Sequence, residues 1–431
     1  MFRKITSDLM KWKESLYRKP LVLQGARQVG KTYAVLEFAR EQYDNIAYVN
    51  FEYDKVAVSI FDNSLDPKEL IPRMEVYTKQ SITKGRTLIF LDEIQKCPPA
   101  LTSLKYFCEF APEYHVVVAG SLLGIAVCRE EFSYPVGKVD RLTLYPMDFE
   151  EFLVVMGQDD LITRIKECFN SNTPIESIYH ISLMEYYRKY LVVGGMPECV
   201  SKFIETGNYT LIRATQKEIL EGYLDDMSKY NSGNEIKKTR LTYSSVTAQL
   251  SKKNTRFQYK LIKSGGRAAE FENAIEWLAL SGIVTRVYAL DTIMKPLRNY
   301  LNMDSFKLFV SDVGLLCAKN NILVNDILYE SSELNDFKGG MTENYVCSQL
   351  VCRGYESFTW YSEGEAEMDF VIQRGGDIVP VEVKSADNSK AKSLGIYRDK
   401  FKPMYAIKVS TNNFGFMNGV KTIPLYAAFC I

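Results

Sequence analysis

Apolar runs and amphipathic segments alternate along the first 150 residues. Four runs, at residues 20–25, 46–52, 87–95 and 115–121, are mostly apolar, whereas residues 33–41 have helical spacing. Strands that are buried on both faces of a parallel sheet give such continuous apolar runs. The alternation of strands and helices therefore predicts an α/β fold with a parallel sheet covered by helices.

Two further patterns follow along the chain. From residue 160 to 228, apolar residues spaced three and four apart predict a run of helices. Residues 244–253 and 267–290 then resemble a winged helix, with a short helix, a second helix and a β wing. A mixed α/β region is expected last, with one helix and three strands at residues 342–351, 357–364, 367–376 and 377–386.

Composition narrows the class of protein. The 431 residues include 53 Lys and Arg against 53 Asp and Glu, and 46% are hydrophobic, as in soluble globular proteins. The longest apolar stretch, residues 116–127, is too short to span a membrane, and the charged first 19 residues do not form a secretory signal. We therefore expect a cytoplasmic protein with no membrane partner. Nine cysteines without a C-x-x-C pair and only two histidines offer little material for a zinc site or a Ser-His-Asp triad.

A glycine-rich motif, GARQVGKT at residues 25–32, lies between the first apolar run and the first helix. Strand, loop and helix in this order are typical of a Walker A loop, whose backbone N–H groups face phosphate. Lys31 would then contact the β- and γ-phosphates, and the Thr32 hydroxyl would ligate Mg²⁺. The alternative is a chance glycine loop. The expected nucleotide-binding residues are Gly25, Ala26, Arg27, Gln28, Val29, Gly30, Lys31, Thr32 and Ser121.

The apolar residues of the third run end at two adjacent carboxylates, Asp92 and Glu93. Ligands of parallel α/β sheets bind beyond the carboxyl ends of the strands, so Asp92 is expected to face the Mg²⁺ of a nucleotide. Glu93 is expected to polarise the attacking water, which makes Lys31, Asp92 and Glu93 the catalytic set and Thr32 and Asp92 the Mg²⁺ ligands. The alternative is a strand end with a capping Asp and a solvated Glu. Ser121 is expected either to sense the γ-phosphate or to cap the following helix.

Both motifs, in this order and at this separation, resemble the AAA-type P-loop ATPases, whose first sensor falls at Ser121. Residues 133–153 and 192–200 are similar to a prokaryotic branch in which the ATPase is fused to a C-terminal domain of unknown function with restriction-endonuclease-like residues. The resemblance implies ATP and Mg²⁺ as cofactors and a homo-oligomer. It also implies that Lys138 or Arg141 supplies a cation to a neighbour's γ-phosphate.

The resemblance and the hydrophobic pattern together suggest four segments. They are an AAA-type ATPase core at residues 1–158, a helical lid at 159–235, a basic winged-helix-like domain at 236–325 and a restriction-endonuclease-like domain at 326–431.

A basic segment stands out in this neutral chain. Residues 236–269 contain nine Lys and Arg but no Asp or Glu, which is the pattern expected for contact with the phosphates of DNA or RNA. The alternative is a solvated basic face or an interdomain surface, and Glu270 and Glu272 nearby favour it. The candidate nucleic-acid contacts are Lys252, Lys253, Arg256 and Arg267.

A second set of charged residues lies in the last hundred. Asp369 and Glu382 fall on neighbouring expected strands, and two carboxylates there could hold Mg²⁺ while Lys384 orients a water. With Glu343 on the preceding helix, this order resembles a PD-(D/E)xK nuclease, although Met368 stands where that motif has proline. The alternatives are a chance E-x-K strand or a fold kept for binding alone.

Three functions remain open for the whole chain. The ATPase could gate a nuclease that acts on DNA or RNA. It could be a nucleotide switch that binds nucleic acid or protein without cleavage. It could also be a self-assembling ATPase with a protein client, in which the basic segment is an oligomer contact.

Overall fold

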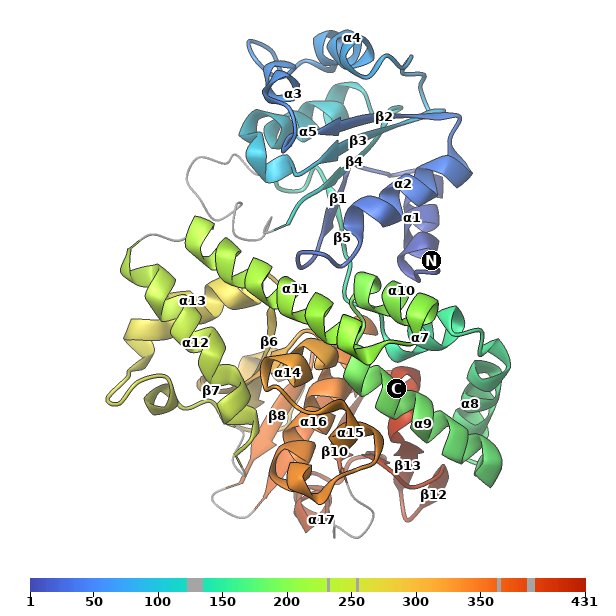
Figure 1. Cartoon of the computed structure of the whole chain (residues 1–431), viewed down its shortest axis with the longest axis vertical. Coiled ribbons are helices and arrows are strands. Elements are labelled where there is room, and N and C mark those ends of the chain that lie inside the picture. The colour runs from blue at the N-terminus through green and yellow to red at the C-terminus, as the bar shows by residue number, and fades with distance from the viewer. Residues whose placement is uncertain (122–134, 231–232, 253–255, 363–365, 386–391) are drawn as a thin grey trace. The chain divides into compact units, whose positions relative to one another are not determined.

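The computed structural model describes residues 1–121, 135–230, 233–252, 256–362, 366–385 and 392–431 (Figure 1). The chain divides into two compact units, one of residues 1–145 with 280–282 and one of residues 146–279 with 283–431. The expected segment boundaries after residues 158, 235 and 325 all fall within the second unit.

The first unit is built on a five-stranded sheet in which every pairing is parallel, in the order β2-β3-β4-β1-β5. This confirms the α/β class predicted from the apolar runs. Because β4 lies between β1 and β3, the carboxyl ends of these three strands meet at one edge. The strands are β1 (Leu21–Gln24), β2 (Asn45–Asn50), β3 (Thr87–Asp92), β4 (His115–Ala119) and β5 (Asp140–Thr143).

Helices cover this sheet, and β3 and β4 are buried along their whole length (Figure 1). One hydrophobic core joins strand residues such as Val49 and Leu91 to Met74 and Leu104 on the covering helices. The helices of the first unit are α1 (Ile5–Glu14), α2 (Lys31–Gln42), α3 (Lys55–Ser59), α4 (Pro67–Thr78), η1 (Ile94–Lys96) and α5 (Pro98–Phe110).

The second unit begins with helices, as the spacing between residues 160 and 228 predicts. They are α7 (Phe149–Val155), α8 (Asp159–Ser171), α9 (Ser177–Val193), α10 (Pro197–Thr206), α11 (Tyr209–Tyr230), α12 (Asn234–Leu250), η2 (Tyr259–Leu261) and α13 (Ala268–Leu280). Later helices are η3 (Leu297–Tyr300), α14 (Val313–Lys319), α15 (Val324–Leu328), η4 (Ser332–Leu334), α16 (Asn335–Cys352), α17 (Lys392–Phe401) and η5 (Leu425–Cys430).

An eight-stranded mixed sheet forms the core of this unit, in the order β12-β13-β11-β10-β9-β8-β6-β7. β8, β9 and β10 pair antiparallel, and β11 lies parallel to β10. The expected helix and three strands of the C-terminal region are therefore present. The strands are β6 (Val284–Leu290), β7 (Leu301–Val310), β8 (Phe358–Tyr361), β9 (Glu367–Arg374), β10 (Asp377–Val383), β11 (Ala406–Ser410), β12 (Gly415–Met417) and β13 (Val420–Pro424).

The expected β wing is present as a hairpin, but this hairpin is part of a larger sheet. β6 and β7 form an antiparallel hairpin, but β6 also pairs in parallel with β8. The hairpin is therefore the edge of the large sheet instead of a free wing. Residues 244–250 of the expected short helix are the end of the longer α12.

A glycine turn between α9 and α10 anchors the middle of this unit. Gly194 has a positive φ of 75°, and a Cβ there would lie 2.3 Å from Asp312 Oδ1. The Gly195 N–H donates to Asp312 Oδ2 at 2.6 Å, while Asp312 Oδ1 caps α14 by accepting from Leu315 N at 2.8 Å. Burial raises the pKa of Asp312 to about 6. The turn needs glycine because a buried carboxylate occupies the space of a side chain.

Within the described ranges, no helix combines the length and the hydropathy needed to cross a membrane.

His115 gives the first unit a pH-dependent stability. Its ring lies at the start of β4, bonded through Nδ1 to the Tyr43 hydroxyl at 2.7 Å, and burial together with Arg18 and Lys13 lowers its pKa to about 4. The unfolded chain binds a proton near pH 6.5, so this stabilisation is complete above that pH and is lost as the pH falls toward 4. Between pH 7 and 5 the first unit should lose about 2 kcal/mol through His115.

The measurement is urea denaturation at pH 7 and pH 5, followed by hydrogen exchange of peptides from the first unit. His115→Gln should remove most of the difference between the two pH values. His180→Gln, in the second unit, is the matched control and should leave it in place. Equal pH dependence in wild type and His115→Gln would refute this role.

Candidate functional site

The loop at residues 25–32 joins the end of β1 to the start of α2. Gly25, Gln28 and Gly30 all have positive φ, at 147°, 64° and 89°. A Cβ at Gly25 would lie 2.1 Å from the Leu144 carbonyl oxygen, so only glycine fits there. Alternating left- and right-handed conformations turn successive N–H groups inward, and this concave backbone at a helix N-terminus suits a phosphate.

Lys31 is folded back over this loop. Its Nζ donates to the Gly25 and Ala26 carbonyl oxygens at 2.9 and 2.7 Å, and the side chain is buried. The ammonium group is thereby kept inside the concave loop, where an incoming phosphate oxygen can replace the carbonyl oxygens as its partner.

The two sequence motifs meet at the carboxylate of Asp92. Thr32 Oγ1 donates to Asp92 Oδ2 at 2.8 Å, so the two expected Mg²⁺ ligands lie in direct contact. The other carboxylate oxygen, Oδ1, accepts from the Glu93 N–H at 3.0 Å. A hydroxyl beside a carboxylate, both next to a phosphate loop, is a donor set that suits Mg²⁺.

Two residues that the sequence analysis missed complete this contact. The Tyr48 hydroxyl donates to Asp92 Oδ2 at 3.1 Å, and Asn50 Nδ2 donates to the same oxygen at 3.4 Å and to the Tyr48 hydroxyl at 3.0 Å. Burial raises the pKa of Tyr48 to about 12, so its hydroxyl stays protonated. The sequence could have indicated them, because side chains two residues apart on a strand lie on the same face, and both residues lie at the end of β2.

Glu93 lies beside Ser121. Ser121 Oγ donates to Glu93 Oε2 at 3.4 Å, and Gln95, also missed, donates to the same Glu93 oxygen and to Ser121 Oγ. Burial raises the pKa of Glu93 above its ordinary value. The alternative role of Ser121 as a helix cap concerns residues 122–134, which lie outside the described residues. Of the two candidate trans-acting cations, Lys138 is paired with Glu109 of its own unit at 3.0 Å.

Residues 17–153 match the family model of an AAA domain. The first unit is an AAA-type P-loop ATPase domain. This match supports ATP binding and hydrolysis, for which Mg²⁺ is the usual partner ion. Two further matches, to domains of unknown function DUF8612 and DUF4143, cover residues 184–325 and 338–428. No curated protein matches the chain.

Several solved structures are similar to the chain that carries this AAA domain. A Walker-type ATPase of Pyrococcus abyssi is 13% identical, with a TM-score of 0.45 over 74% of this chain and 95% of the other. The ORC1 protein of Aeropyrum pernix, solved in complex with DNA, is 13% identical, with a TM-score of 0.30 over 77% of this chain and 93% of the other. Cdc6p of Pyrobaculum aerophilum is 11% identical, with a TM-score of 0.25 over 75% and 92%. At these scores, the assignment depends on the AAA match alone.

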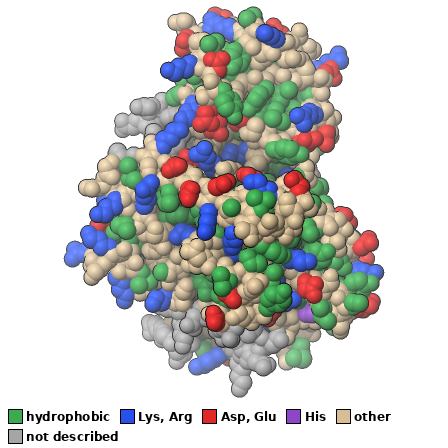
Figure 2. All heavy atoms as spheres, viewed as in Figure 1, with side chains coloured by type: hydrophobic (Ala, Val, Ile, Leu, Met, Phe, Trp, Pro, Cys, Tyr) green, Lys and Arg blue, Asp and Glu red, His purple; other side chains and the backbone are tan. Residues whose placement is uncertain are grey.

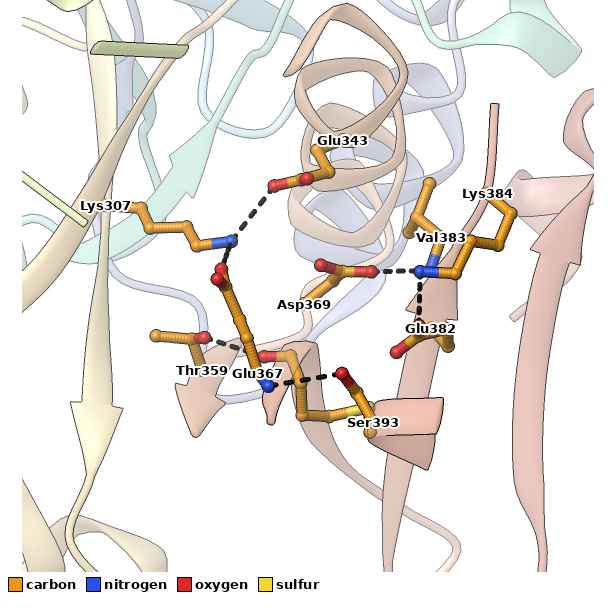
Figure 3. A network of polar contacts seen from close by, with 10 residues as sticks. Lys307, Glu343, Thr359, Glu367, Asp369, Glu382, Val383, Lys384 and Ser393 are labelled. Carbon is orange, nitrogen blue, oxygen red and sulfur yellow. Dashed lines mark hydrogen bonds and ion pairs between the residues drawn. The ribbon is translucent and has the colours of Figure 1, made fainter. Parts of the chain in front are cut away.

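A second polar centre lies in the large sheet of the other unit (Figure 3). It brings together the four residues predicted from the sequence: Glu343 on α16, Asp369 on β9, and Glu382 and Lys384 at the end of β10. Asp369 Oδ2 accepts from the Val383 N–H at 2.7 Å, and Lys384 forms an ion pair with Glu382. We call this set, with the two residues described next, the carboxylate centre.

Lys307 and Glu367 belong to this centre and were not predicted. Lys307 comes from β7, is completely buried, and contacts Glu343 Oε2 at 3.0 Å and Glu367 Oε1 at 2.5 Å. Burial alone would lower the pKa of Lys307, but Glu343 and Glu367 raise it well above its ordinary value. No local pattern could have paired it with residues that follow it by more than thirty positions.

Burial perturbs the carboxylates of the centre. It raises the pKa of Glu343 to about 7, and burial followed by the charge of Glu382 raises the pKa of Asp369 to about 7. Glu382 is 1% exposed, and its Oε2 atom has no hydrogen-bond partner. Buried oxygens are usually paired, and this one is open to a ligand. Within the described part of the chain, no three His, Cys, Asp or Glu side chains are grouped to hold a metal ion together.

The basic segment is only partly available for nucleic acid. Figure 2 shows Lys and Arg side chains gathered on the face of the second unit that carries α12 and α13. Lys252 and Arg267 are exposed, whereas the Arg256 guanidinium lies 4.0 Å from the Tyr361 ring centroid and packs against the sheet. Lys253 lies outside the described residues. The structure thus leaves Lys252 and Arg267 as the accessible members of the candidate set.

Substitution of Ser121 tests whether its hydroxyl helps to position the Glu93 carboxylate. Ser121→Ala removes a hydroxyl donor beside Glu93 and should lower kcat for ATP roughly 100-fold with little change in nucleotide affinity. Ser121→Thr retains the hydroxyl and is the matched control. Steady-state phosphate release and nucleotide binding by fluorescence separate the two parameters. A loss of affinity with unchanged kcat would place Ser121 outside the catalytic geometry.

Proposed function

We propose that the chain hydrolyses ATP to ADP and phosphate in its first unit, and that Thr32 and Asp92 hold the Mg²⁺ of the nucleotide. The observation that carries this proposal is the 2.8 Å hydrogen bond between Thr32 and Asp92, which joins the phosphate loop to the carboxylate strand. ATP is the expected substrate because the AAA match covers both motifs.

Each residue of the site has a distinct task in this proposal. Lys31 exchanges its contacts with the loop carbonyls for the β- and γ-phosphates. Glu93 accepts the proton of the attacking water, and a pKa raised by burial suits a general base near neutral pH. Ser121 and Gln95 orient that carboxylate. Mg²⁺, when bound, neutralises charge on the phosphates, and no covalent intermediate is needed.

A second activity is proposed for the other unit: metal-dependent cleavage of DNA or RNA at the carboxylate centre. The observation that favours it is the unpaired, buried Oε2 of Glu382, next to Lys384 and close to Asp369. Asp369 and Glu382 would ligate Mg²⁺, and Lys384 would orient the attacking water. The nucleic acid would be bound by Lys252, Lys253 and Arg267, and the nucleotide state of the first unit would control access.

Two alternatives to this coupled activity remain. A nucleotide switch would bind nucleic acid without cleaving it, so substitution of Lys252 would matter more than substitution of Asp369. In a homo-oligomer with a protein client, Lys252→Glu would disrupt assembly and leave nucleic-acid affinity unchanged.

Substitutions at Lys31 and Glu93 test the ATPase. Lys31→Ala removes the phosphate contact and should abolish both binding and turnover. Glu93→Gln keeps the shape of the side chain and should bind ATP normally while turnover falls at least 100-fold, since the proton acceptor is lost. Phosphate release and equilibrium binding of ATP are measured on the full chain. Turnover by Lys31→Ala at the wild-type rate would refute the proposed site.

Cleavage is tested with end-labelled DNA and RNA in Mg²⁺ or Mn²⁺, with and without ATP. Lys384→Ala should lose cleavage at least 100-fold and keep nucleic-acid affinity, because Lys384 acts on the water and not on the bound strand. Lys252→Glu is the matched control, which should weaken binding without altering the centre. Cleavage that persists in Lys384→Ala would assign it to a contaminant or another site, and absence of cleavage in wild type would favour the switch.

A further inference from the structure

Lys307 links two parts of the sequence that match different family models. It lies on β7, within residues 184–325, which match DUF8612. Its partners Glu343 and Glu367 lie within residues 338–428, which match DUF4143. The pairing of β6 with β8 places the β6–β7 hairpin in the same sheet as β9 and β10. A buried ammonium is therefore a built-in member of the carboxylate centre.

The centre divides into two halves around Asp369 (Figure 3). On one side, Lys307 contacts both Glu343 and Glu367. On the other side, Lys384 pairs with Glu382, and Asp369 accepts the adjacent Val383 N–H. Glu343 and Glu367 thus each form an ion pair with Lys307, while Glu382 has one buried oxygen with no hydrogen-bond partner.

Charge sets how many cations the centre can take. Four carboxylates face two ammonium groups, so the centre carries a net charge of −2 when all six groups are ionised. One divalent cation neutralises this charge, and a second would leave an excess of +2 in a buried site, at a high cost in free energy. Mg²⁺ is commonly held by only one or two carboxylates together with water.

We infer that Lys307 takes the place of a second metal ion, so that the centre binds a single divalent cation on Asp369 and Glu382. Glu343, which the sequence suggested as a supporting carboxylate, lies outside the ligand set and neutralises Lys307. This inference rests on the metal site proposed above.

The test counts Mn²⁺ bound to the nucleotide-free full chain by electron paramagnetic resonance. Wild type should bind one Mn²⁺ per chain, and Glu382→Gln should bind none. Lys307→Met releases Glu343 and Glu367 and should bind two. Glu367→Gln, which lowers the negative charge while Lys307 remains, should bind its single Mn²⁺ at least tenfold more weakly than wild type.

A double variant guards against misfolding. Lys307→Met/Glu367→Gln removes one charge of each sign, keeps the net charge at −2, and should bind one Mn²⁺. Circular dichroism checks that each variant is folded. If wild type and folded Lys307→Met each bind one Mn²⁺, or if wild type binds two, the role of Lys307 is overturned while the proposed metal site stands. No Mn²⁺ in wild type would overturn the proposed metal site and this inference with it.

Discussion

The hydrogen bond from Thr32 to Asp92 is the contact on which the proposed chemistry of the first unit depends. It joins residues 60 positions apart, and it forms because the order of the parallel strands brings the ends of β1 and β3 to either side of β4. The end of β4 then supplies Ser121 between them. A buried carboxylate is costly unless its oxygens are bonded, and Tyr48 and Asn50 satisfy Asp92 from the neighbouring strand.

In the carboxylate centre of the second unit, positively charged lysine side chains offset the cost of burying carboxylates. Glu343 and Glu367 are partly buried, and one ammonium group from β7 contacts both. Lys384 serves Glu382 in the same way, but leaves one oxygen of that carboxylate unpaired. In each unit, then, donors hold most of the carboxylate oxygens in place. Hydroxyl and amide groups do this around Asp92, whereas two lysines and the Val383 N–H do it in the second unit.

Local pattern was enough to predict four of the five strands of the first unit, the phosphate loop, and the helix and strands around Glu343, Asp369 and Glu382. The edge strand β5 was not predicted. These features depend on runs of a few residues, where hydrophobic periodicity and glycine position carry the information. Lys307 was missed because its role depends on which strands become neighbours. Tyr48 lies on a face that the period-two pattern defines, but its contact with Asp92 depends on the pairing of β2 with β3. The winged helix stays a prediction, since the pairing of β6 with β8, which no local pattern shows, makes the hairpin part of the large sheet. Asp312, which requires glycine at Gly194, is likewise defined by a contact between distant segments.

We propose that Thr32, Asp92 and Glu93 form a Mg²⁺-dependent ATPase site in the first unit. Phosphate release from ATP by the purified chain, as Mg²⁺ is titrated from zero in the presence of a chelator, tests this directly. We expect no release without Mg²⁺ and a saturable rise as Mg²⁺ is added. Release that is independent of Mg²⁺, or no release at any Mg²⁺ concentration, would contradict it.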